Sequence, residues 1–585
     1  MYGHFHHFQA REDKRFPAMA SLNPYGKLNE SDQERLISHR KMRRRITVVG
    51  LSSIVLVAVI VASVVGVFHS KNGNSGGENQ SISSSIKAIC NVTLYPDSCY
   101  NSLFPLVKSG NFQPEDIFKL SVQVAINELT KISNDVLENG LEKFNISDKM
   151  TLAAIESCQE LLSLSLDHLN KSLSLRDLKL LKILDDLRTW LSSAGTYQQT
   201  CLDGLNALSS FVGRYLKNST EYTSNSLAII SSIQDSIDAL GAIGRRRLMS
   251  FGNVEVPNWL SFKDRKLLNI PSSEIKADAV VAKDGSGKYK SITDALKDVP
   301  DNNHTRFVIY VKAGVYVENV RVEKTKWNVM IVGDGMNLTV VSGSLNYIDG
   351  TPTFQSATFA VFGQGFIARD MGFLNTAGAA KQQAVALLST ADLSVFYRCS
   401  IDAFQDTLYT HSNRQFYSEC NISGTVDFIF GNSAVVLQKC NILPKNPMRG
   451  QQNIITAQGK IDPNQNTGIS IQNCNILPSG NLTGVSTFLG RPWKNYSTTS
   501  YIRNIMGNFI DPRGWLPWMG AAAPDTIFYV EFQNFGPGAL TTNRVNWTGL
   551  KVNISASEAE KFTVNSFING DKWLPAAGVS FNSGL

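Results

Sequence analysis

The chain has 585 residues, of which 43% are hydrophobic and 18% charged, and its formal net charge is +7 at pH 7. This length exceeds one ordinary domain, so we expect two or three domains. Part of the positive charge lies in a short basic run at residues 40–45, so the surplus gives a nucleic-acid-binding function little support. The eight cysteines form no Cys-x-x-Cys pair, which argues against a zinc site.

Residues 1–85 divide into a tail, an apolar segment and a linker. Residues 1–45 are polar and charged, which predicts a disordered cytoplasmic tail. Residues 46–68 carry no charge and are long enough to span a bilayer, and the preceding basic residues favour a signal-anchor. A cleaved signal peptide is the alternative, although its charged part and apolar core would both be unusually long. Residues 69–85 are rich in Gly, Ser and Asn and predict a linker.

Two features beyond the apolar segment indicate a secreted glycoprotein. About a dozen Asn-x-Ser/Thr sequons follow it, among them Asn91, Asn145, Asn218, Asn337 and Asn546. The cysteines fall into two groups of four, which are Cys90, Cys99, Cys158 and Cys201, and then Cys399, Cys420, Cys440 and Cys474. Even numbers in each group suggest disulfides and therefore an oxidising compartment.

Residues 86–240 predict an all-α domain. Leu187, Trp190, Leu191 and Ala194 have helical spacing, and glycine is scarce. Four long helices joined by two disulfides account for this pattern. Four cysteines allow three pairings, among which the spacing does not choose.

Three short motifs in this helical region are shared with a known family. They are Thr93-x-Tyr95-Pro96-x-x-Cys99, Glu156-Ser157-Cys158 and Cys201-Leu202-Asp203-Gly204, and they resemble the plant invertase and pectin methylesterase inhibitor family. The resemblance implies the pairs Cys90–Cys99 and Cys158–Cys201. A helical bundle that only assists folding or transport is the alternative.

Residues 241–268 predict a processing linker. This stretch contains two basic clusters, Arg245-Arg246-Arg247-Leu248-Met249 and Arg265-Lys266-Leu267-Leu268. An extended linker can enter a protease cleft, so we expect cleavage by a secretory-pathway protease at Arg246-Arg247-Leu248-Met249 or at the second cluster. A solvated run of charges is the alternative.

Residues 269–585 are rich in short apolar runs bounded by turn residues, which predicts β-structure. Cysteine followed by Ser or Asn and then Ile recurs at Cys399, Cys420, Cys440 and Cys474, with two nearly equal intervals and then a longer one. Recurrence at about 20 residues favours a parallel β-helix over a β-sandwich. Stacked Cys399 and Cys420 could then form a disulfide, since one coil step falls within the usual Cα separation of roughly 4.4–6.8 Å. Cys440–Cys474 would be the second bridge.

Polar residues at regular intervals predict the active site. The step from Gln383 to Gln405 equals the step from Gln405 to Asp427, and Asp406 follows Gln405. One patch on adjacent coils would therefore hold two amides and two carboxylates. Two close carboxylates titrate as a coupled pair in which one group keeps its proton. The ionised group can then act as a nucleophile and the protonated group as an acid. The alternative is that each Asp caps a turn.

The sequence lacks the residues that other common catalytic mechanisms need. The β-rich part contains only two histidines, His304 and His411, and no Gly-x-Ser-x-Gly elbow lies near them, which argues against a serine hydrolase. Neither a cluster with metal-ligand spacing nor a nucleotide loop is present, so we expect no metal and no other cofactor.

Five ordered motifs of the β-rich part resemble the pectin methylesterases. They are Gly314-x-Tyr316-x-Glu318, Gln383-Ala-Val-Ala-Leu387, Gln405-Asp406-Thr-Leu408, Asp427-Phe-Ile-Phe-Gly431 and Leu489-Gly490-Arg491-Pro492-Trp493. With the inhibitor-like region, they imply a right-handed parallel β-helix catalytic domain preceded by an all-α four-helix-bundle pro-domain. The implied substrate is methyl-esterified homogalacturonan (pectin) of the cell wall, and proteinaceous inhibitors are further candidate partners.

The resemblance also implies residue roles. Asp427 matches the nucleophile, Asp406 the general acid and base, and Gln383 and Gln405 the amides that stabilise the oxyanion. The implied substrate-binding residues are Thr358, Gln383, Arg491 and Trp493. Leu388 and Phe404 depart from residues common in the family, which puts local substrate preference in doubt.

Two other functions stay open on the sequence alone. One is another β-helix enzyme of the same polymer, a lyase or a polygalacturonase. The other is an inhibitor or wall-binding protein that acts through the helical domain.

Overall fold

The computed structural model describes residues 75–107, 113–133, 148–174, 183–205, 208–244, 274–520 and 522–585. The predicted cytoplasmic tail, the signal-anchor at residues 46–68 and both basic clusters lie outside these ranges. Within them, no helix has the length and apolar character that a bilayer span needs.

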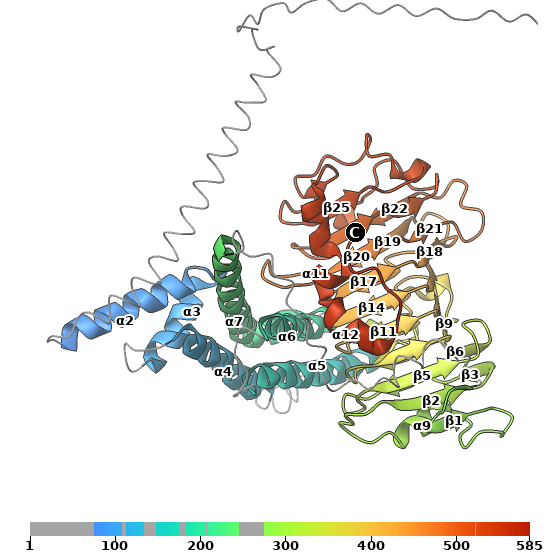
Figure 1. Ribbon diagram of the computed structural model, residues 1–585, viewed down its shortest axis with the longest axis horizontal. Helices are drawn as coiled ribbons and strands as arrows, with labels where there is room; N and C mark the ends of the chain where they lie inside the picture. The colour runs from blue at the N-terminus through green and yellow to red at the C-terminus, as the bar shows by residue number, and fades with distance from the viewer. Residues whose placement is uncertain are drawn as a thin grey trace, which may run out of the picture. The chain divides into compact units, whose positions relative to one another are not determined.

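Six helices make up the N-terminal part of the described chain (Figure 1). They are α2 (Ser75–Cys90), α3 (Pro96–Leu103), α4 (Pro114–Ile132), α5 (Lys149–Leu173), α6 (Leu184–Gly204) and α7 (Ser209–Gly244). Helix α4 begins at a proline, and Asp148 caps α5 by accepting a hydrogen bond from the Thr151 amide at 2.8 Å. Residues 75–85, predicted as linker, belong instead to helix α2.

The predicted four-helix arrangement is confirmed by α4, α5, α6 and α7, which pack around one hydrophobic core. Leu187, Trp190, Leu191 and Ala194 are all buried in it. Cys90–Cys99 links α2 to the start of α3, and Cys158–Cys201 links α5 to α6. These are the two pairs that the resemblance implies.

Most of the described residues from 274 onward form a parallel β-helix, as predicted. The eleven-stranded sheet contains β1 (Ala279–Val281), β2 (Phe307–Val311), β5 (Val329–Gly333), β8 (Ile367–Arg369), β11 (Ser394–Tyr397), β14 (Arg414–Ser418), β17 (Ala434–Gln438), β20 (Gly468–Gln472), β23 (Thr498–Ile502), β25 (Phe528–Phe532) and β26 (Leu550–Lys551). The seven-stranded sheet contains β4 (Val320–Val322), β7 (Phe359–Val361), β10 (Leu387–Ser389), β13 (Leu408–Thr410), β16 (Ile429–Gly431), β19 (Asn453–Gln458) and β22 (Thr487–Gly490).

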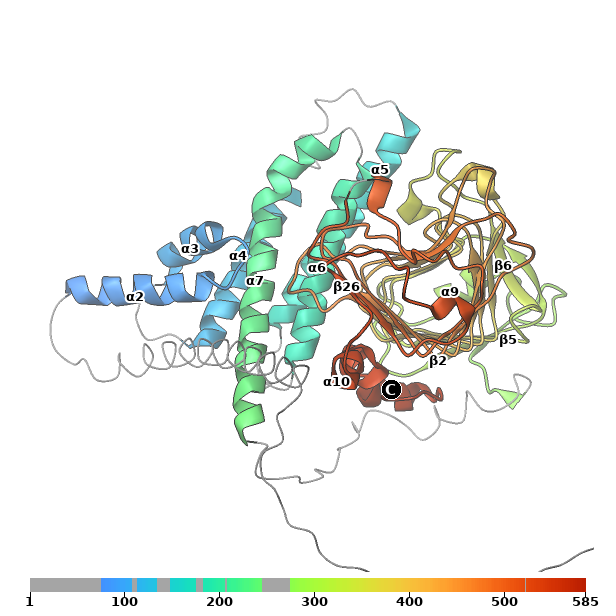
Figure 2. The same ribbon diagram turned by 90° about the horizontal axis from the view of Figure 1, so that it is seen from above.

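The eight-stranded sheet contains β3 (Gly314–Val317), β6 (Thr339–Gly343), β9 (Gly372–Asn375), β12 (Ser400–Asp402), β15 (Asn421–Gly424), β18 (Asn441–Pro444), β21 (Asn475–Ile476) and β24 (Ile505–Met506). The pairs in all three sheets are parallel, and the strands enclose a packed apolar interior (Figure 2). Four short helices complete this domain: α9 (Ile292–Lys297), α10 (Ala556–Ala559), α11 (Val564–Ile568) and α12 (Gly570–Ala577). Helices α11 and α12 pack on the outer face of the eleven-stranded sheet.

The register of the seven-stranded sheet corrects the predicted interval. Leu387 pairs with Leu408, and Leu408 pairs with Ile429. One coil of this sheet therefore contains as many residues as separate Asp406 from Asp427 in the sequence. These two carboxylates therefore occupy the same position of neighbouring coils. The step that separates Gln383, Gln405 and Asp427 is slightly longer than a coil, so these residues lie on adjacent coils but shift by one position at each step.

The second group of cysteines forms a stack without disulfides. Cys399, Cys420, Cys440 and Cys474 are buried and free, so the predicted bridges Cys399–Cys420 and Cys440–Cys474 are wrong. A left-handed residue precedes each cysteine and turns it inward at the same point of its coil. Each thiol donates to a carbonyl of the preceding coil, as Cys420 does to Phe396 O at 3.3 Å. Equivalent side chains in such a stack run parallel, which does not turn the Cβ atoms toward each other as a disulfide requires.

The helical domain packs on the outer face of the seven-stranded sheet (Figure 2). Apolar residues of that face belong to the same hydrophobic cluster as the helices: Val385, Leu388, Tyr409, Phe430 and Ala457. Tyr197 of α6 is fully buried, and its hydroxyl lies 3.0 Å from Thr390 Oγ1 and accepts a hydrogen bond from Asn413 Nδ2. Five ion pairs also cross the interface: Glu160–Arg321, Asp167–Lys324, Asp185–Lys572, Asp186–Arg414 and Asp203–Lys494.

Candidate active site

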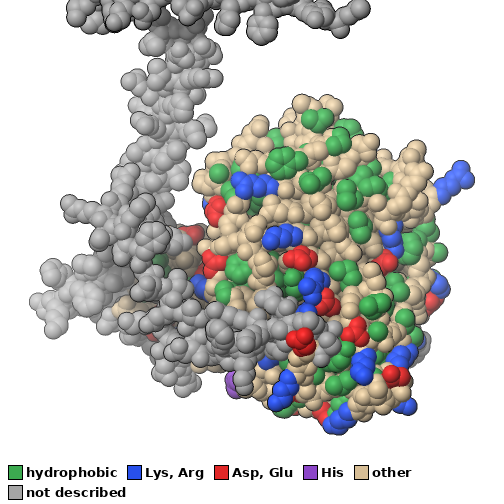
Figure 3. Space-filling model, turned by 45° about the vertical axis from the view of Figure 1, so that its right-hand side comes forward, with side chains coloured by type: hydrophobic (Ala, Val, Ile, Leu, Met, Phe, Trp, Pro, Cys, Tyr) green, Lys and Arg blue, Asp and Glu red, His purple; other side chains and the backbone are tan. Residues whose placement is uncertain are grey.

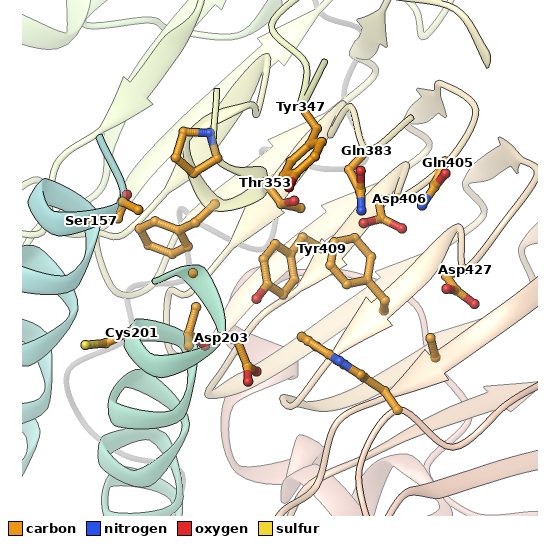
Figure 4. A pocket seen from close by; sticks show the side chains of 18 of the residues that line it. Ser157, Cys201, Asp203, Tyr347, Thr353, Gln383, Gln405, Asp406, Tyr409 and Asp427 are labelled. Atoms are coloured by element: carbon orange, nitrogen blue, oxygen red, sulfur yellow. The ribbon is translucent and has the colours of Figure 1, made fainter. Parts of the chain in front are cut away.

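A cavity of about 430 Å³ lies between α5 and α6 on one side and the seven-stranded sheet on the other. Both predicted carboxylates line it, together with Gln383 and Gln405 (Figure 4). Arg491 and Trp493 line it as well. The structure thus brings together six predicted residues that lie far apart in the sequence.

Asp406 and Asp427 each precede a strand of this sheet, β13 and β16. Both have left-handed backbone, with φ of 62° and 51°. The Asp406 amide donates to Val426 O at 3.0 Å. This bond fixes the two coils side by side, so equivalent atoms are roughly 4.7–4.9 Å apart.

The surroundings of the two carboxylates are apolar along the stack of coils. The equivalent positions on the flanking coils are Val385 and Ile454. Only 8% of Asp406 and 5% of Asp427 is exposed. Water therefore screens the two groups little, and their mutual interaction is strong.

Arg491, which follows β22, holds Asp427 through two parallel hydrogen bonds. Its Nε donates to Asp427 Oδ1 at 2.9 Å, and its terminal nitrogen donates to Oδ2 at 2.6 Å. Trp518 stacks against the guanidinium, whose carbon lies 4.3 Å from the ring centroid. This bidentate pair fixes the direction in which the carboxylate faces and favours its ionised form.

The two carboxyl groups differ in charge state for physical reasons. Burial raises the pKa of Asp427 above its ordinary value, while the hydrogen bonds and positive charge of Arg491 oppose this rise. Burial, together with the nearby charge of Asp427, raises the pKa of Asp406 further, to well above its ordinary value. Asp427 therefore loses its proton first, and Asp406 keeps its own.

The two predicted amides lie beside Asp406 in Figure 4. Gln383 Oε1 is buried without a hydrogen-bond partner among the described residues. Both side chains line the cavity, so their amide groups face the space next to the carboxylates. Such groups can donate hydrogen bonds to an oxygen atom that gains negative charge during a reaction.

The other two predicted substrate-binding residues differ in position. Trp493 lines the cavity, and its ring centroid lies 6.2 Å from that of Phe430. Thr358 is fully buried outside the cavity, where its hydroxyl donates to Leu374 O at 3.1 Å, so the structure does not support a substrate contact there. Thr353 and Phe354, a few residues earlier, line the cavity instead.

The sequence did not reveal that the helical domain forms one wall of the cavity. Thr200, Cys201 and Asp203 of α6 line it, and Asp203 forms an ion pair with Lys494 at 2.6 Å. The Thr200 hydroxyl lies 2.9 Å from Nε2 of His411, whose burial lowers its pKa to about 3. His411 is thus a buried structural residue. The inhibitor-like motif Cys201-Leu202-Asp203-Gly204 carried the available signal, because three of its residues reach this wall.

The first motif of the β-rich part has a structural role. The Glu318 carboxylate accepts hydrogen bonds from the amides of Ile292 and Thr293 at the start of α9. Tyr316 is buried, and its hydroxyl donates to Lys312 O at 2.8 Å. In the described part of the chain, no group of three or more His, Cys, Asp or Glu side chains is arranged to hold a metal ion.

Comparison with known families identifies both domains. The pectinesterase model matches residues 278–571, and the plant invertase/pectin methylesterase inhibitor model matches residues 84–229. The chain is 54% identical to "Probable pectinesterase/pectinesterase inhibitor 46" of Arabidopsis thaliana, over 96% of this chain and 100% of the relative. It is 47% identical to "Pectinesterase 3" of Phaseolus vulgaris, over 97% of this chain and 99% of the relative.

A solved structure, "Pectin methylesterase from Carrot", is similar to the β-helix domain. Its sequence is 53% identical, it covers 53% of this chain and 99% of its own, and the TM-score is 0.53. The two carboxylates, both amides, Arg491 and Trp493 all lie within the region that the pectinesterase model matches. The chain therefore belongs to the pectinesterase family and carries an inhibitor-type helical domain ahead of its pectinesterase domain.

Proposed function

We propose that this chain is a pectin methylesterase, a carboxylic ester hydrolase that converts methyl-esterified homogalacturonan into de-esterified pectin and methanol. The observation that carries the proposal is the asymmetric carboxylate pair, in which Asp427 is held ionised by Arg491 and Asp406 keeps its proton. Membership of the pectinesterase family and the names of the relatives support the same substrate.

In the first half of the reaction, the Asp427 carboxylate attacks the carbonyl carbon of the methyl ester. The carbonyl oxygen becomes an oxyanion, to which the amides of Gln383 and Gln405 donate hydrogen bonds. When the tetrahedral intermediate collapses, the bond to the methoxy oxygen breaks, and Asp406 gives its proton to that oxygen. Methanol leaves, and the galacturonate unit remains bound to Asp427 as an anhydride.

In the second half, Asp406 acts as a base. Its carboxylate takes a proton from a water molecule, whose oxygen attacks the acyl carbon of the anhydride. Collapse of this intermediate releases the galacturonate carboxylic acid and restores the Asp427 carboxylate and protonated Asp406. Trp493 supplies an aromatic face on which a sugar ring can stack.

The helical domain inhibits the precursor in this proposal, since it forms one wall of the cavity that holds the carboxylates. Cleavage at Arg246-Arg247-Leu248-Met249 or Arg265-Lys266-Leu267-Leu268 by a secretory-pathway protease would separate the two domains. The segment at residues 46–68 would hold the precursor in a membrane of the secretory pathway. The mature domain would then act in the cell wall, where its substrate occurs.

Replacement of Asp427 tests the proposed chemistry. In the purified 269–585 fragment, we expect Asp427→Asn to lower the rate of methanol release by roughly a thousandfold or more, because the nucleophile is lost while the side-chain shape is kept. Asp402→Asn is the matched control, since Asp402 pairs with Lys445 on the same β-helix and lies outside the cavity. Undiminished methanol release from Asp427→Asn would overturn the assignment, and shortened polymer chains without methanol would favour a lyase or polygalacturonase.

A further inference from the structure

A second cavity, of about 500 Å³, lies where α6 meets the β-helix, and we call it the seam cavity. It shares no lining residue with the cavity that holds Asp406 and Asp427. The helical domain contributes Asp185 and Arg188. The loops around β19 and β23 and the C-terminal segment contribute the remaining walls, which include Lys460, Gln465, Tyr496, Lys561, Phe562 and Phe567.

Three cations line the seam cavity, the partly buried Arg188 and Lys460 and the exposed Lys561. Among the described residues, the charged groups of Arg188, Lys460 and Lys561 form no ion pair and no hydrogen bond, and Arg188 Nε is buried with its hydrogen-bonding capacity unused. The one acidic residue in the lining, Asp185, faces Lys572 at 3.4 Å. The ion pairs elsewhere in this interface are complete, so the seam cavity is the exception within it.

The surroundings of Lys460 favour an anion beside it. Burial lowers the pKa of Lys460 to about 8, and the charge of Arg188 acts in the same direction against the opposing charge of Asp462. On the face of the β-helix in Figure 3, by contrast, basic and acidic side chains are interspersed and exposed. A buried cation that lacks a counterion is stabilised strongly by an anion that enters beside it.

The rest of the lining suits a sugar. Tyr496, Phe528, Phe562 and Phe567 supply aromatic surface, and the amide oxygen of Asn466 is buried without a hydrogen-bond partner among the described residues. Aromatic faces pack against the apolar faces of sugar rings, while amides and cations bind hydroxyl and carboxylate groups.

We propose that the seam cavity binds an acidic oligosaccharide, with a uronate carboxylate between Arg188 and Lys460. The choice of a uronate rests on the proposed function, whereas the anion site itself rests on the unpaired cations. Because the two domains each supply one of these cations, the ligand binds best when the helical domain is docked. By linkage, the ligand then stabilises the docked arrangement to the same degree. De-esterified product would thus strengthen the hold of the inhibitory domain on the precursor.

Calorimetric titration of the full chain with digalacturonate at pH 7 tests the site. We expect Lys460→Met and Arg188→Met each to weaken binding roughly tenfold or more, because each removes one of the two cations and keeps a long apolar side chain. Lys324→Met is the matched control, since Lys324 is an exposed cation of the same interface and neither it nor its partner Asp167 lines the seam cavity. Binding that is unchanged in both cavity variants would overturn the proposal.

The pH dependence of binding separates the role of Lys460 from general packing. Lys460 lines the cavity together with Arg188, Lys561 and Asp185, and the carboxylate of Asp462 also acts on it. Above pH 8 the neutral amine of Lys460 must gain a proton before the anion binds, so the affinity should fall by up to about tenfold per pH unit. Lys460→Arg keeps the charge, so its affinity should not change between pH 7 and pH 9. An equal pH dependence in the wild-type chain and in Lys460→Arg would contradict the proposal.

Inorganic phosphate distinguishes a sugar site from a general anion site. We expect phosphate to compete with digalacturonate only weakly, because it cannot use the aromatic walls. Competition at equal affinity would overturn the assignment to a sugar. Methanol release by the 269–585 fragment does not involve the seam cavity, so this proposal and the proposed esterase function fail in separate experiments.

Discussion

At the scale of single residues, the active site depends on one difference between two identical side chains. Asp406 and Asp427 occupy the same position of adjacent coils, with the same left-handed backbone and similar burial. What separates them is Arg491, which contacts Asp427 through two hydrogen bonds. One guanidinium is thus enough to divide the roles of nucleophile and acid between equivalent positions of a repeat.

This dependence on Arg491 predicts a shift in pH profile. Asp427 acts in its ionised form, so activity is lost as the pH falls through its pKa. In the wild-type chain, Arg491 opposes the rise in the pKa of Asp427 that burial causes. Arg491→Met removes this effect, so the pKa of Asp427 should increase and activity should be lost at a higher pH. In the 269–585 fragment, we expect the acid limb of kcat/KM for methanol release to move upward, with a fall of roughly a hundredfold at neutral pH.

Arg513→Met is the control for this measurement. Arg513 forms an exposed pair with Asp511 away from the cavity, so its loss should leave the profile unchanged. An acid limb that stays in place in Arg491→Met would show that Arg491 does not control the charge of Asp427.

Most of the site residues could be predicted from the sequence, because they stand in motifs that a known family shares. Gln383, Gln405, Asp406 and Asp427 stand in motifs tied to strands, whose register the fold repeats on each coil. The resemblance implies that Thr358 binds substrate, but Thr358 is buried outside the cavity, while Thr353 and Phe354 of the preceding 3-10 turn line it. No periodicity marks which side of such a turn faces a ligand.

At the scale of elements, the motif Asp427-Phe-Ile-Phe-Gly431 is explained by its strand. Phe428 and Ile429 are fully buried in the interior, while Phe430 lies on the outer face beneath the helical domain. Gly431 ends the strand with φ of 130°, and a Cβ atom there would clash with the carbonyl oxygen of Thr410. The glycine is therefore required by the close approach of two coils rather than by chemistry.

Replacement of this glycine should destabilise the β-helix. We expect Gly431→Ala in the 269–585 fragment to lower the free energy of unfolding by roughly 3–5 kcal/mol, since the clash involves backbone that is fixed by neighbouring strands. Gly450→Ala is the control, because Gly450 also has positive φ but no atom lies within 4 Å of its Cβ position. Its cost should be about 1–2 kcal/mol, from the positive φ alone. Urea denaturation measures both, and equal midpoints would contradict the explanation.

The cysteine stack shows what sequence spacing alone does not determine. The recurrence of Cys-Ser/Asn-Ile located the coils correctly, and the cysteines do stack. Spacing fixes which residues are neighbours but not the direction in which their Cβ atoms point, and in this stack the directions are parallel. The even spacing of Gln383, Gln405 and Asp427 has a similar limit, because the strand register places Asp406, rather than Gln405, level with Asp427.

At the scale of the whole molecule, the helical domain acts as a cover whose contacts are largely specific. Ser193 of α6 is buried at the interface and donates a hydrogen bond to Asn413 Oδ1 at 2.8 Å. Gln465 of the β-helix donates to Ser192 O at 3.0 Å. These contacts fix α6 against the coils that adjoin the carboxylates, so small changes there should separate the domains without damage to the site.

A bulky charge in this interface should activate the uncleaved chain. We expect Ser193→Arg to increase methanol release by the full chain several-fold, because an unpaired guanidinium cannot be buried against Asn413. Ser210→Arg is the control, as Ser210 is exposed on α7. Circular dichroism should show equal helix content in both variants. If the wild-type full chain already releases methanol as fast as the 269–585 fragment, inhibition by the helical domain is ruled out.

The apolar outer face of the seven-stranded sheet has a consequence for biosynthesis. Val385, Leu388, Tyr409 and Phe430 would be exposed on an isolated β-helix whose coils are only partly formed. The helical domain precedes these coils in the chain, so it leaves the ribosome and folds before they are synthesised. Each new coil can then dock on the apolar surface of the folded helical domain. This shortens the time during which the growing sheet is exposed and could pair with other chains.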